Sequence, residues 1–143
     1  MRYLLLLVLL ASCAPTSQKI EGEVYVVTEG RETVRLAGSQ VSAYPLADFE
    51  KLLVEKGTSN PDVYSYLTPL PPLVEKVTTD SEGKFSMTLP KGEYALLAVE
   101  HRDVGGRKEF YQWLVKAQPK TVLTNNNLAG RGDSLLPKRF ALP

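Results

Sequence analysis

The sequence is poor in the residues from which most active sites and metal centres are built. Its 143 residues include one cysteine (Cys13), one histidine (His101) and one tryptophan (Trp113). A zinc centre needs three or four converging protein ligands, which are usually cysteine or histidine. Neither a Gly-x-Ser-x-Gly nucleophile elbow nor a glycine-rich phosphate-binding loop occurs. We therefore predict that the protein is not an enzyme and holds neither a metal nor a cofactor.

An excess of charge of one sign is also absent. The chain has 17 basic and 16 acidic residues, and its lysines and arginines gather in no stripe. Proteins that bind nucleic acid neutralise phosphates with clustered lysine and arginine, so nucleic acid is not an expected partner. The content of 43% hydrophobic and 23% charged residues argues against disorder and predicts one globular core.

The only long apolar run lies at the N-terminus. Arg2 precedes the run of residues 3–10, and the small residues Ala11 and Ser12 follow it. This is the order of a secretory signal peptide. The run is shorter than the roughly 20 apolar residues that a membrane-spanning helix needs. Residues 1–12 are therefore predicted to be a cleaved signal peptide, and the mature protein to be extracytoplasmic.

Cys13 stands directly behind this leader. The segment Leu10-Ala11-Ser12-Cys13 resembles the lipobox of bacterial lipoproteins, whose cysteine is acylated and becomes the first residue of the mature chain. The resemblance implies a lipid anchor at Cys13 in the membrane of the cell envelope, and two or three acyl chains hold a protein there effectively permanently. Ala14 is not aspartate, which by resemblance to the sorting rule of enteric bacteria favours the outer membrane. The alternative is ordinary cleavage after Ala14, which would leave Pro15 behind the scissile bond.

The mature chain reads mainly as short strands. Apolar and polar residues alternate over 20–26 and again over 85–89, the period of half-buried strands, and turn residues separate such segments throughout. Between them, residues 46–56 have apolar residues at helical spacing, and 61–67 can form a second helical turn. The polar residues 101–108 read as an exposed hairpin loop. The expected organisation is a signal peptide (1–12), a flexible tether (13–19), an antiparallel β-sandwich of about seven strands (20–128) with a helical insertion (45–76), and a C-terminal tail (129–143).

Several turn glycines and core positions follow a recognisable order. These are Ile20-x-Gly22-x-Val24, Leu36-Ala37-Gly38-x-x-Val41, Thr79-Asp80-x-x-Gly83-x-Phe85 and Leu89-Pro90-x-Gly92-x-Tyr94. The pattern resembles the carboxypeptidase regulatory-like family, whose members have a transthyretin-like (prealbumin-like) sandwich. The resemblance implies a non-catalytic accessory or surface domain. It runs from the first predicted strand to Leu96 and is interrupted by the insertion.

Tyr111 and Trp113 share one face of a predicted strand. If that face were exposed, the two rings would form a platform for sugar rings, and the protein would be a carbohydrate-binding module with a polysaccharide as partner. The opposite face, with Phe110, Gln112 and Leu114, is more polar, and this favours the interpretation that Tyr111 and Trp113 fill the core.

The insertion supplies a second candidate surface. Tyr64, Tyr66 and Leu70 exceed the apolar content that a solvated loop needs, and long ordered loops tend to be functional or to cover something. These residues either receive a partner protein of the cell envelope or complete a lid, in which the helix covers one open end of the sandwich.

His101 is the remaining candidate for chemistry, beside Glu100 and Asp103, and a solvated loop position is the favoured interpretation because further ligands are lacking. The tripeptide Arg131-Gly132-Asp133 matches an adhesion motif but reads as a solvated turn. The sequence thus predicts a lipid-anchored, non-enzymatic envelope protein that presents loops or an edge strand to a protein partner.

Overall fold

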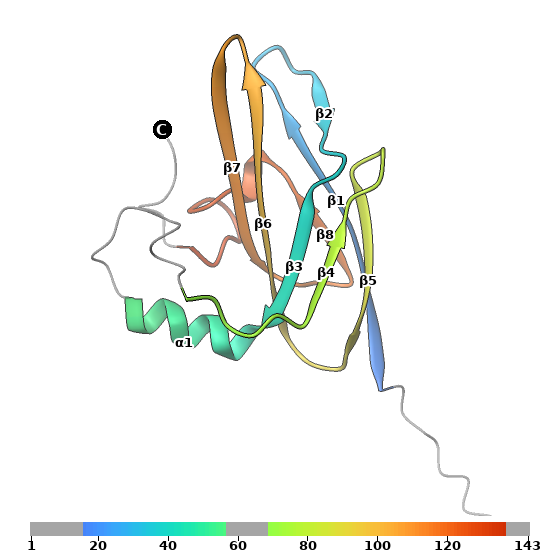
Figure 1. The fold of residues 1–143 in the computed structure, drawn as a ribbon, viewed down its shortest axis with the longest axis vertical. Helices are drawn as coiled ribbons and strands as arrows, with labels where there is room; N and C mark the ends of the chain where they lie inside the picture. Colours follow the sequence, from blue (N-terminus) through green and yellow to red (C-terminus); the bar gives the residue numbers. More distant parts are fainter. Residues whose placement is uncertain (1–15, 57–68, 137–143) are drawn as a thin grey trace, which may run out of the picture.

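The computed structural model describes residues 16–56 and 69–136, which form a sandwich of two β-sheets with one α-helix on its outside (Figure 1). The fold is all-β, as the sequence predicts. In chain order the elements are β1 (Ser17–Val27), β2 (Thr33–Arg35), β3 (Gln40–Pro45), α1 (Leu46–Lys56), β4 (Glu75–Thr78), β5 (Lys84–Pro90), β6 (Tyr94–Val104), β7 (Arg107–Lys116), β8 (Lys120–Leu123) and the 3-10 turn η1 (Asn125–Asn127).

The first sheet is built around β1. Glu21 and Glu23 pair with β5 and also with β8, so these two strands lie on opposite sides of β1. The short strand β2 pairs with the last residues of β1, 25–27. The described part of the chain thus contains eight strands rather than about seven. Among them, β8 runs parallel to β1, and all other neighbouring strands are antiparallel.

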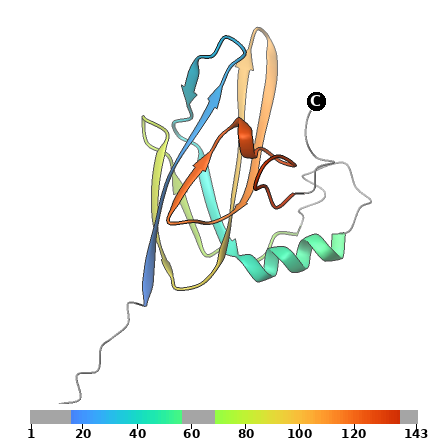
Figure 2. The same cartoon turned by 180° about the vertical axis from the view of Figure 1, so that it is seen from behind.

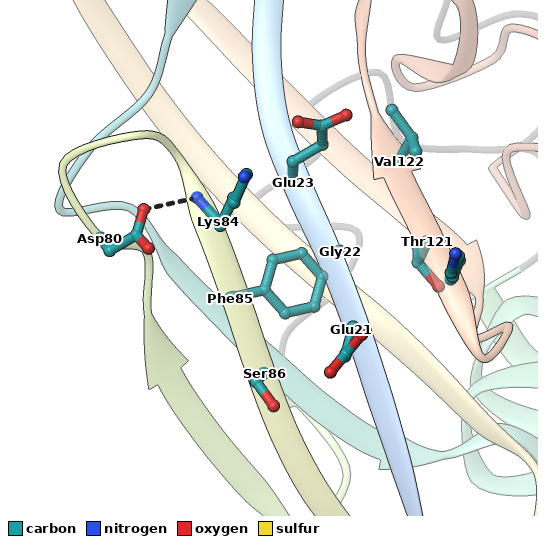
Figure 3. Close-up of a pocket in the computed structure, with 10 residues that line it drawn as sticks. Glu21, Gly22, Glu23, Asp80, Lys84, Phe85, Ser86, Thr121 and Val122 are labelled. Carbon is teal, nitrogen blue, oxygen red and sulfur yellow. Dashed lines mark hydrogen bonds between the residues drawn. The ribbon is translucent and has the colours of Figure 1, made fainter.

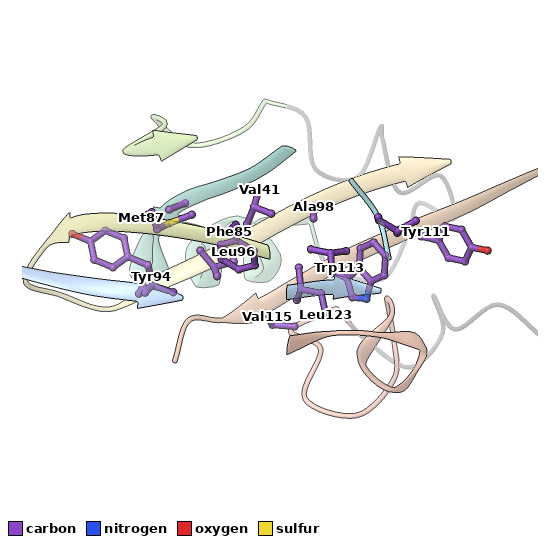
Figure 4. Packing of buried hydrophobic residues seen from close by; sticks show 14 of the residues in the cluster. Val41, Phe85, Met87, Tyr94, Leu96, Ala98, Tyr111, Trp113, Val115 and Leu123 are labelled. Carbon is purple, nitrogen blue, oxygen red and sulfur yellow. The ribbon is translucent and has the colours of Figure 1, made fainter. Parts of the chain in front are cut away.

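The second sheet has the order β4-β3-β6-β7 and is antiparallel throughout. The alternation read from the sequence decides which side chains enter the space between the sheets: along β5, the buried positions alternate strictly with the exposed ones. Figure 4 shows the resulting core, to which both sheets contribute. Its largest members are Phe85, Met87, Leu89, Tyr94, Leu96, Tyr111, Trp113 and Leu123.

Helix α1 covers the outward face of the second sheet. The predicted helix over residues 46–56 is confirmed. Phe49 is fully buried, and its ring lies edge to face with that of Tyr44, with the ring centroids 5.1 Å apart. The same cluster contains Leu114 of β7 and Leu136 of the C-terminal tail. The helix therefore packs on outward-facing side chains and not over the opening between the sheets, and the face of Leu114, predicted to be the polar one, is apolar and buried where helix and tail lie on it.

Two further expectations are wrong in detail. Strand β1 begins at Ser17 and not at Ile20, because residues 17–19 pair with the end of β5 although their polar side chains show no apolar alternation. The predicted hairpin loop over residues 101–108 is instead part of a continuous antiparallel pairing of β6 with β7, which reaches Val104 and Arg107. Only Gly105 and Gly106 form the turn, with φ values of 56° and 79°, as a two-residue hairpin turn requires.

Other predictions concern residues outside the described ones. These are the signal peptide 1–12, the acylated Cys13 and the second helical turn at 61–67. Among the described residues, no helix is long and apolar enough to cross a membrane.

Candidate functional site

Two long strands, β6 and β7, extend beyond the rest of the second sheet. Strand β3 pairs with β6 only as far as Ala98, whereas the pairing of β6 with β7 continues to the glycine turn. Figures 1 and 2 show the resulting two-stranded projection rising beside the turn between β1 and β2. We call residues 100–110 the ribbon. Because side chains alternate along a strand, the ribbon has an inner face turned toward β1 and an outer face.

The inner face of the ribbon and the β1–β2 turn enclose a cavity of about 590 Å³, which we call the ribbon pocket. It lies at the end of the sandwich opposite the start of β1 (Figure 1). Seven of its eleven lining residues have polar side chains, and two are valines. The lining consists of Val27, Thr28, Glu29, Gly30, Arg102, Val104, Gly105, Arg107, Glu109, Tyr111 and Asn125.

Polar side chains hold the floor of the ribbon pocket in place. The Tyr111 hydroxyl donates to the Glu109 carboxylate, and the Arg102 guanidinium lies beside the same hydroxyl. Asn125 fastens the end of β1: the Val27 N–H donates to Asn125 Oδ1 at 2.6 Å, and Asn125 Nδ2 donates to the Val27 carbonyl at 3.1 Å. These contacts hold Tyr111 and the end of β1 in place at the floor of the pocket.

Tyr111 has a perturbed ionisation. Burial of the ring raises the pKa of the hydroxyl, the hydrogen bond to the Glu109 carboxylate raises it further, and Arg102 acts in the opposite direction. The neutral phenol is therefore the form that the site holds at physiological pH, and it serves as a hydrogen-bond donor.

A buried serine braces the ribbon where it leaves the sheet. Ser39 is 1% exposed, and its hydroxyl donates to Glu100 Oε2 at 2.6 Å. The other oxygen, Glu100 Oε1, accepts from the backbone N–H of His101 at 2.9 Å. The Glu100 carboxylate thus accepts the hydrogen bond of a main-chain N–H group, that of His101, at one edge of the ribbon.

A second, shallower cavity of about 440 Å³ lies on the outer face of the first sheet (Figure 3). Its charged groups already have neighbours: Lys19 lies 2.8 Å from Glu21, and Asp80 accepts the backbone N–H groups of Glu82 and Lys84. Those contacts lower the pKa of the Glu21 carboxyl, through Lys19, and the pKa of the Asp80 carboxyl, through the N–H groups of Lys84 and Glu82. We interpret this surface as a solvent-exposed sheet face whose charged side chains already have hydrogen-bond or ion-pair partners.

The favoured interpretation, that Tyr111 and Trp113 fill the core, is confirmed, and the alternative of an exposed aromatic platform is wrong. Trp113 has no exposed surface and Tyr111 is 8% exposed. The two rings stack with centroids 5.9 Å apart, and the Trp113 indole N–H donates to the Thr124 carbonyl at 2.8 Å (Figure 4). Since both faces of the Trp113 ring are covered, neither it nor its neighbour offers a surface for sugar rings.

The other predicted site residues are scattered. Leu70 is 44% exposed, whereas Tyr64 and Tyr66, like Cys13, lie outside the described residues. His101 is exposed on the outer face of the ribbon, with its ring 6.2 Å from that of Phe110. Within 16–56 and 69–136, no group of three or more histidine, cysteine, aspartate or glutamate side chains is placed to hold a metal ion.

The sequence reasoning missed the polar lining of the ribbon pocket, including Arg102, Arg107 and Glu109. A signal for it exists in the Gly105-Gly106 pair. A two-residue turn implies that the strands on either side continue to it, and the alternation then places those three side chains on the face of Tyr111.

Comparisons with known proteins add little. No family model matches the chain, and no curated protein does. Among solved structures, a candidate carbohydrate-binding protein from Pseudomonas aeruginosa matches with 20% identity over 76% of this chain and 88% of its own, at a TM-score of 0.48. The shaft pilin SpaA from Lactobacillus rhamnosus GG matches with 12% identity over 76% of this chain and 48% of its own, at 0.42. The N-terminal domain of SpaA alone matches with 12% identity over 76% of this chain and 92% of its own, at a TM-score of 0.43. We draw no functional argument from likeness at this level.

Proposed function

We propose that the protein is a non-enzymatic binding domain, anchored in a bacterial cell envelope by lipid at Cys13, which presents the ribbon end of its sandwich to a partner protein. The observation that carries the proposal is the direction of β1. This strand starts at Ser17, four residues after Cys13, and its far end at Val27 lines the ribbon pocket.

The length of β1 sets the reach of the domain. Eleven residues of strand span about 35 Å. The first described residue, Thr16, accepts a hydrogen bond through its carbonyl from the Lys91 N–H, so the anchored end of β1 is tied to the β5–β6 turn. A lipid at Cys13 would therefore hold the β5–β6 turn near the bilayer and direct the ribbon away from it, where a partner has access.

The chemistry of the ribbon end supports binding over catalysis. Several of its polar groups are engaged with one another or with the backbone, as in the contact of Tyr111 with Glu109 and the two hydrogen bonds between Asn125 and Val27. His101 points to the outer face of the ribbon, away from the pocket. Groups arranged in this way shape a surface and donate or accept hydrogen bonds, and none of them forms a nucleophile and base pair.

Site-specific photocrosslinking in the native cell tests the proposal. A photoreactive residue at Glu29 or at Val104, both at the ribbon end, is expected to join the protein to a discrete partner. The same residue at Lys91, at the anchored end, is the matched control and is expected to give no such adduct. Adducts that are absent at both ribbon positions, or equally strong at Lys91, would refute the proposal.

The anchor is tested separately. Mass spectrometry of the purified protein is expected to find a mature chain that begins at an acylated Cys13, and Cys13→Ser is expected to release the protein from the membrane fraction. An unmodified chain that still begins at Met1 would contradict the anchor.

A further inference from the structure

The ribbon has two edges, and they differ. Above Ala98 the strand β6 has no pairing with β3, and β7 is joined to the C-terminal tail only from Gln112 onward. Within the described residues, both edges of the ribbon therefore present main-chain groups without a neighbouring strand. Unpaired edges are the places where another chain can add a strand.

The edge of β6 is blocked. Val99, His101 and Asp103 direct their main-chain groups to this side, because Glu100 and its alternate neighbours pair with β7. The His101 N–H is already taken by the Glu100 carboxylate, which Ser39 holds in place. An added strand would have to break this contact.

Among residues 16–56 and 69–136, none pairs with the β7 edge before Gln112. The carbonyls of Gln112 and Leu114 accept the N–H groups of Ala129 and Leu135 at 2.8 and 2.7 Å, so they point away from β6. The N–H and C=O of one residue point to the same side of a strand, and this side alternates along the chain. Lys108 and Phe110 must therefore direct two N–H and two C=O groups along the same edge, on the glycine-turn side of the contacts that the described tail residues make with it.

Side chains beside this edge indicate what would bind. Phe110 is 58% exposed, on the outer face. Lys108 lies two residues away on the same face and is also exposed. An added strand would place one side chain opposite Phe110 and one opposite Lys108. An apolar side chain is preferred opposite Phe110, and an acidic one is preferred opposite Lys108.

We propose that the β7 edge at residues 108–110 is a strand-addition site for an extended segment of a partner protein, with an apolar and an acidic residue two positions apart. The inference rests on the proposed function and specifies the edge and the kind of segment. The C-terminal tail already uses main-chain acceptors of this β7 edge within the chain, since Ala129 and Leu135 donate to the carbonyls of Gln112 and Leu114.

A second copy of this chain fits the edge poorly. Antiparallel two-fold pairing of β7 with itself, centred on Glu109 or on Lys108, puts identical charges directly opposite each other, which is destabilising. Pairing centred on Phe110 runs the second strand along Gln112 and Leu114, whose carbonyls the tail already occupies. The occupant is therefore a different protein.

Paired proline substitutions test the site. Lys108 and Asp103 are cross-strand partners, and their N–H groups point to opposite edges of the ribbon. Proline is tolerated where a strand N–H faces solvent, and it removes that donor. The probe is the capped peptide Thr-Ile-Thr-Glu-Thr-Thr, titrated to millimolar concentration against the full-length protein in detergent. Lys108→Pro is expected to weaken binding about tenfold, as the loss of a hydrogen bond implies, while Asp103→Pro changes it less than about twofold.

Two further measurements keep the test decisive if a proline variant fails to fold. Phe110→Ser leaves the main chain intact and is expected to weaken binding about tenfold through the lost apolar contact. A peptide N-methylated at the residues that pair with β7 is expected not to bind. Equal affinities for the two proline variants, undiminished binding of the N-methylated peptide, or no binding of the unmodified peptide would each overturn the inference.

The outcomes also separate this inference from the proposed function. Crosslinks from Val104 that persist in the Lys108→Pro protein would leave the ribbon end as the binding surface and refute strand addition. A lack of crosslinks in the unaltered protein would refute the proposed function itself.

Discussion

The two halves of β6 and β7 share one continuous ladder but stand in opposite surroundings. Residues Tyr94–Ala98 of β6 are all buried, because the first sheet covers one face and α1 with the tail covers the other. Residues Glu100–Val104 of the same strand are half-buried or exposed. Backbone pairing is equal in both halves. The comparison teaches that packing determines which half stabilises the fold, and it leaves the other half available for binding.

Two aromatic residues of β7 are expected to show the largest difference in stability between the buried and the exposed half. Trp113→Ala is expected to lower the free energy of unfolding by about 3–5 kcal/mol, because it leaves a cavity and removes the hydrogen bond to Thr124. Phe110→Ala, three residues away and exposed, is expected to change it by less than about 0.5 kcal/mol. Urea denaturation of both variants is the measurement. Comparable losses would mean that the ribbon is packed in solution.

A glycine of β1 tests the packed part of the sandwich next. A Cβ at Gly22 would lie 2.1 Å from the Thr121 carbonyl oxygen and 2.5 Å from Phe85 Cζ. Gly22→Ala is therefore expected to destabilise by about 1–3 kcal/mol, since a packed core has to shift. Gly30→Ala, at the ribbon end, is the control: the nearest atom is 3.8 Å away, and little change is expected. A neutral Gly22→Ala in thermal and urea unfolding would contradict the close packing of β1 on Phe85.

The smallest effect concerns pH at the ribbon pocket. The pKa of Tyr111 is raised in the folded state above its ordinary value of 10.0, mainly by burial and then by Glu109. A raised folded pKa contributes stability that is complete below the unfolded pKa and is lost as the pH rises through the folded pKa. The stability difference between the unaltered protein and Tyr111→Phe should therefore be constant from neutral pH to about 9 and shrink above 10. Unfolding curves at a series of pH values measure it, and a constant difference throughout would contradict the buried phenol.

Much of the fold could be predicted from particular residues. The alternation of Tyr111, Trp113 and Val115 against their neighbours assigned them to the core, because a strand turns successive side chains to opposite faces. The spacing of Leu46, Phe49 and Leu52 predicted α1 in the same way. Both patterns are local, and the structure confirms both.

The candidate site was less accessible to sequence reasoning. The ribbon is exposed on both faces, so its side chains lack the apolar alternation that reveals a strand, and only Gly105 and Gly106 indicated a tight turn. The burial of Leu114 was equally hidden, since the elements that cover it, α1 and the tail, come from distant parts of the chain.

The sequence by itself determined the sandwich, the position of its helix and the inward face of each core strand, because these follow from periodicity within a few residues. Only the tertiary structure decided which edge of the ribbon is open. That outcome depends on Glu100 reaching Ser39 across 61 positions of sequence, and on the described tail residues bonding to β7 only at Gln112 and beyond, toward Lys116. Such contacts join residues that no local pattern relates, and they exist only once the chain has folded.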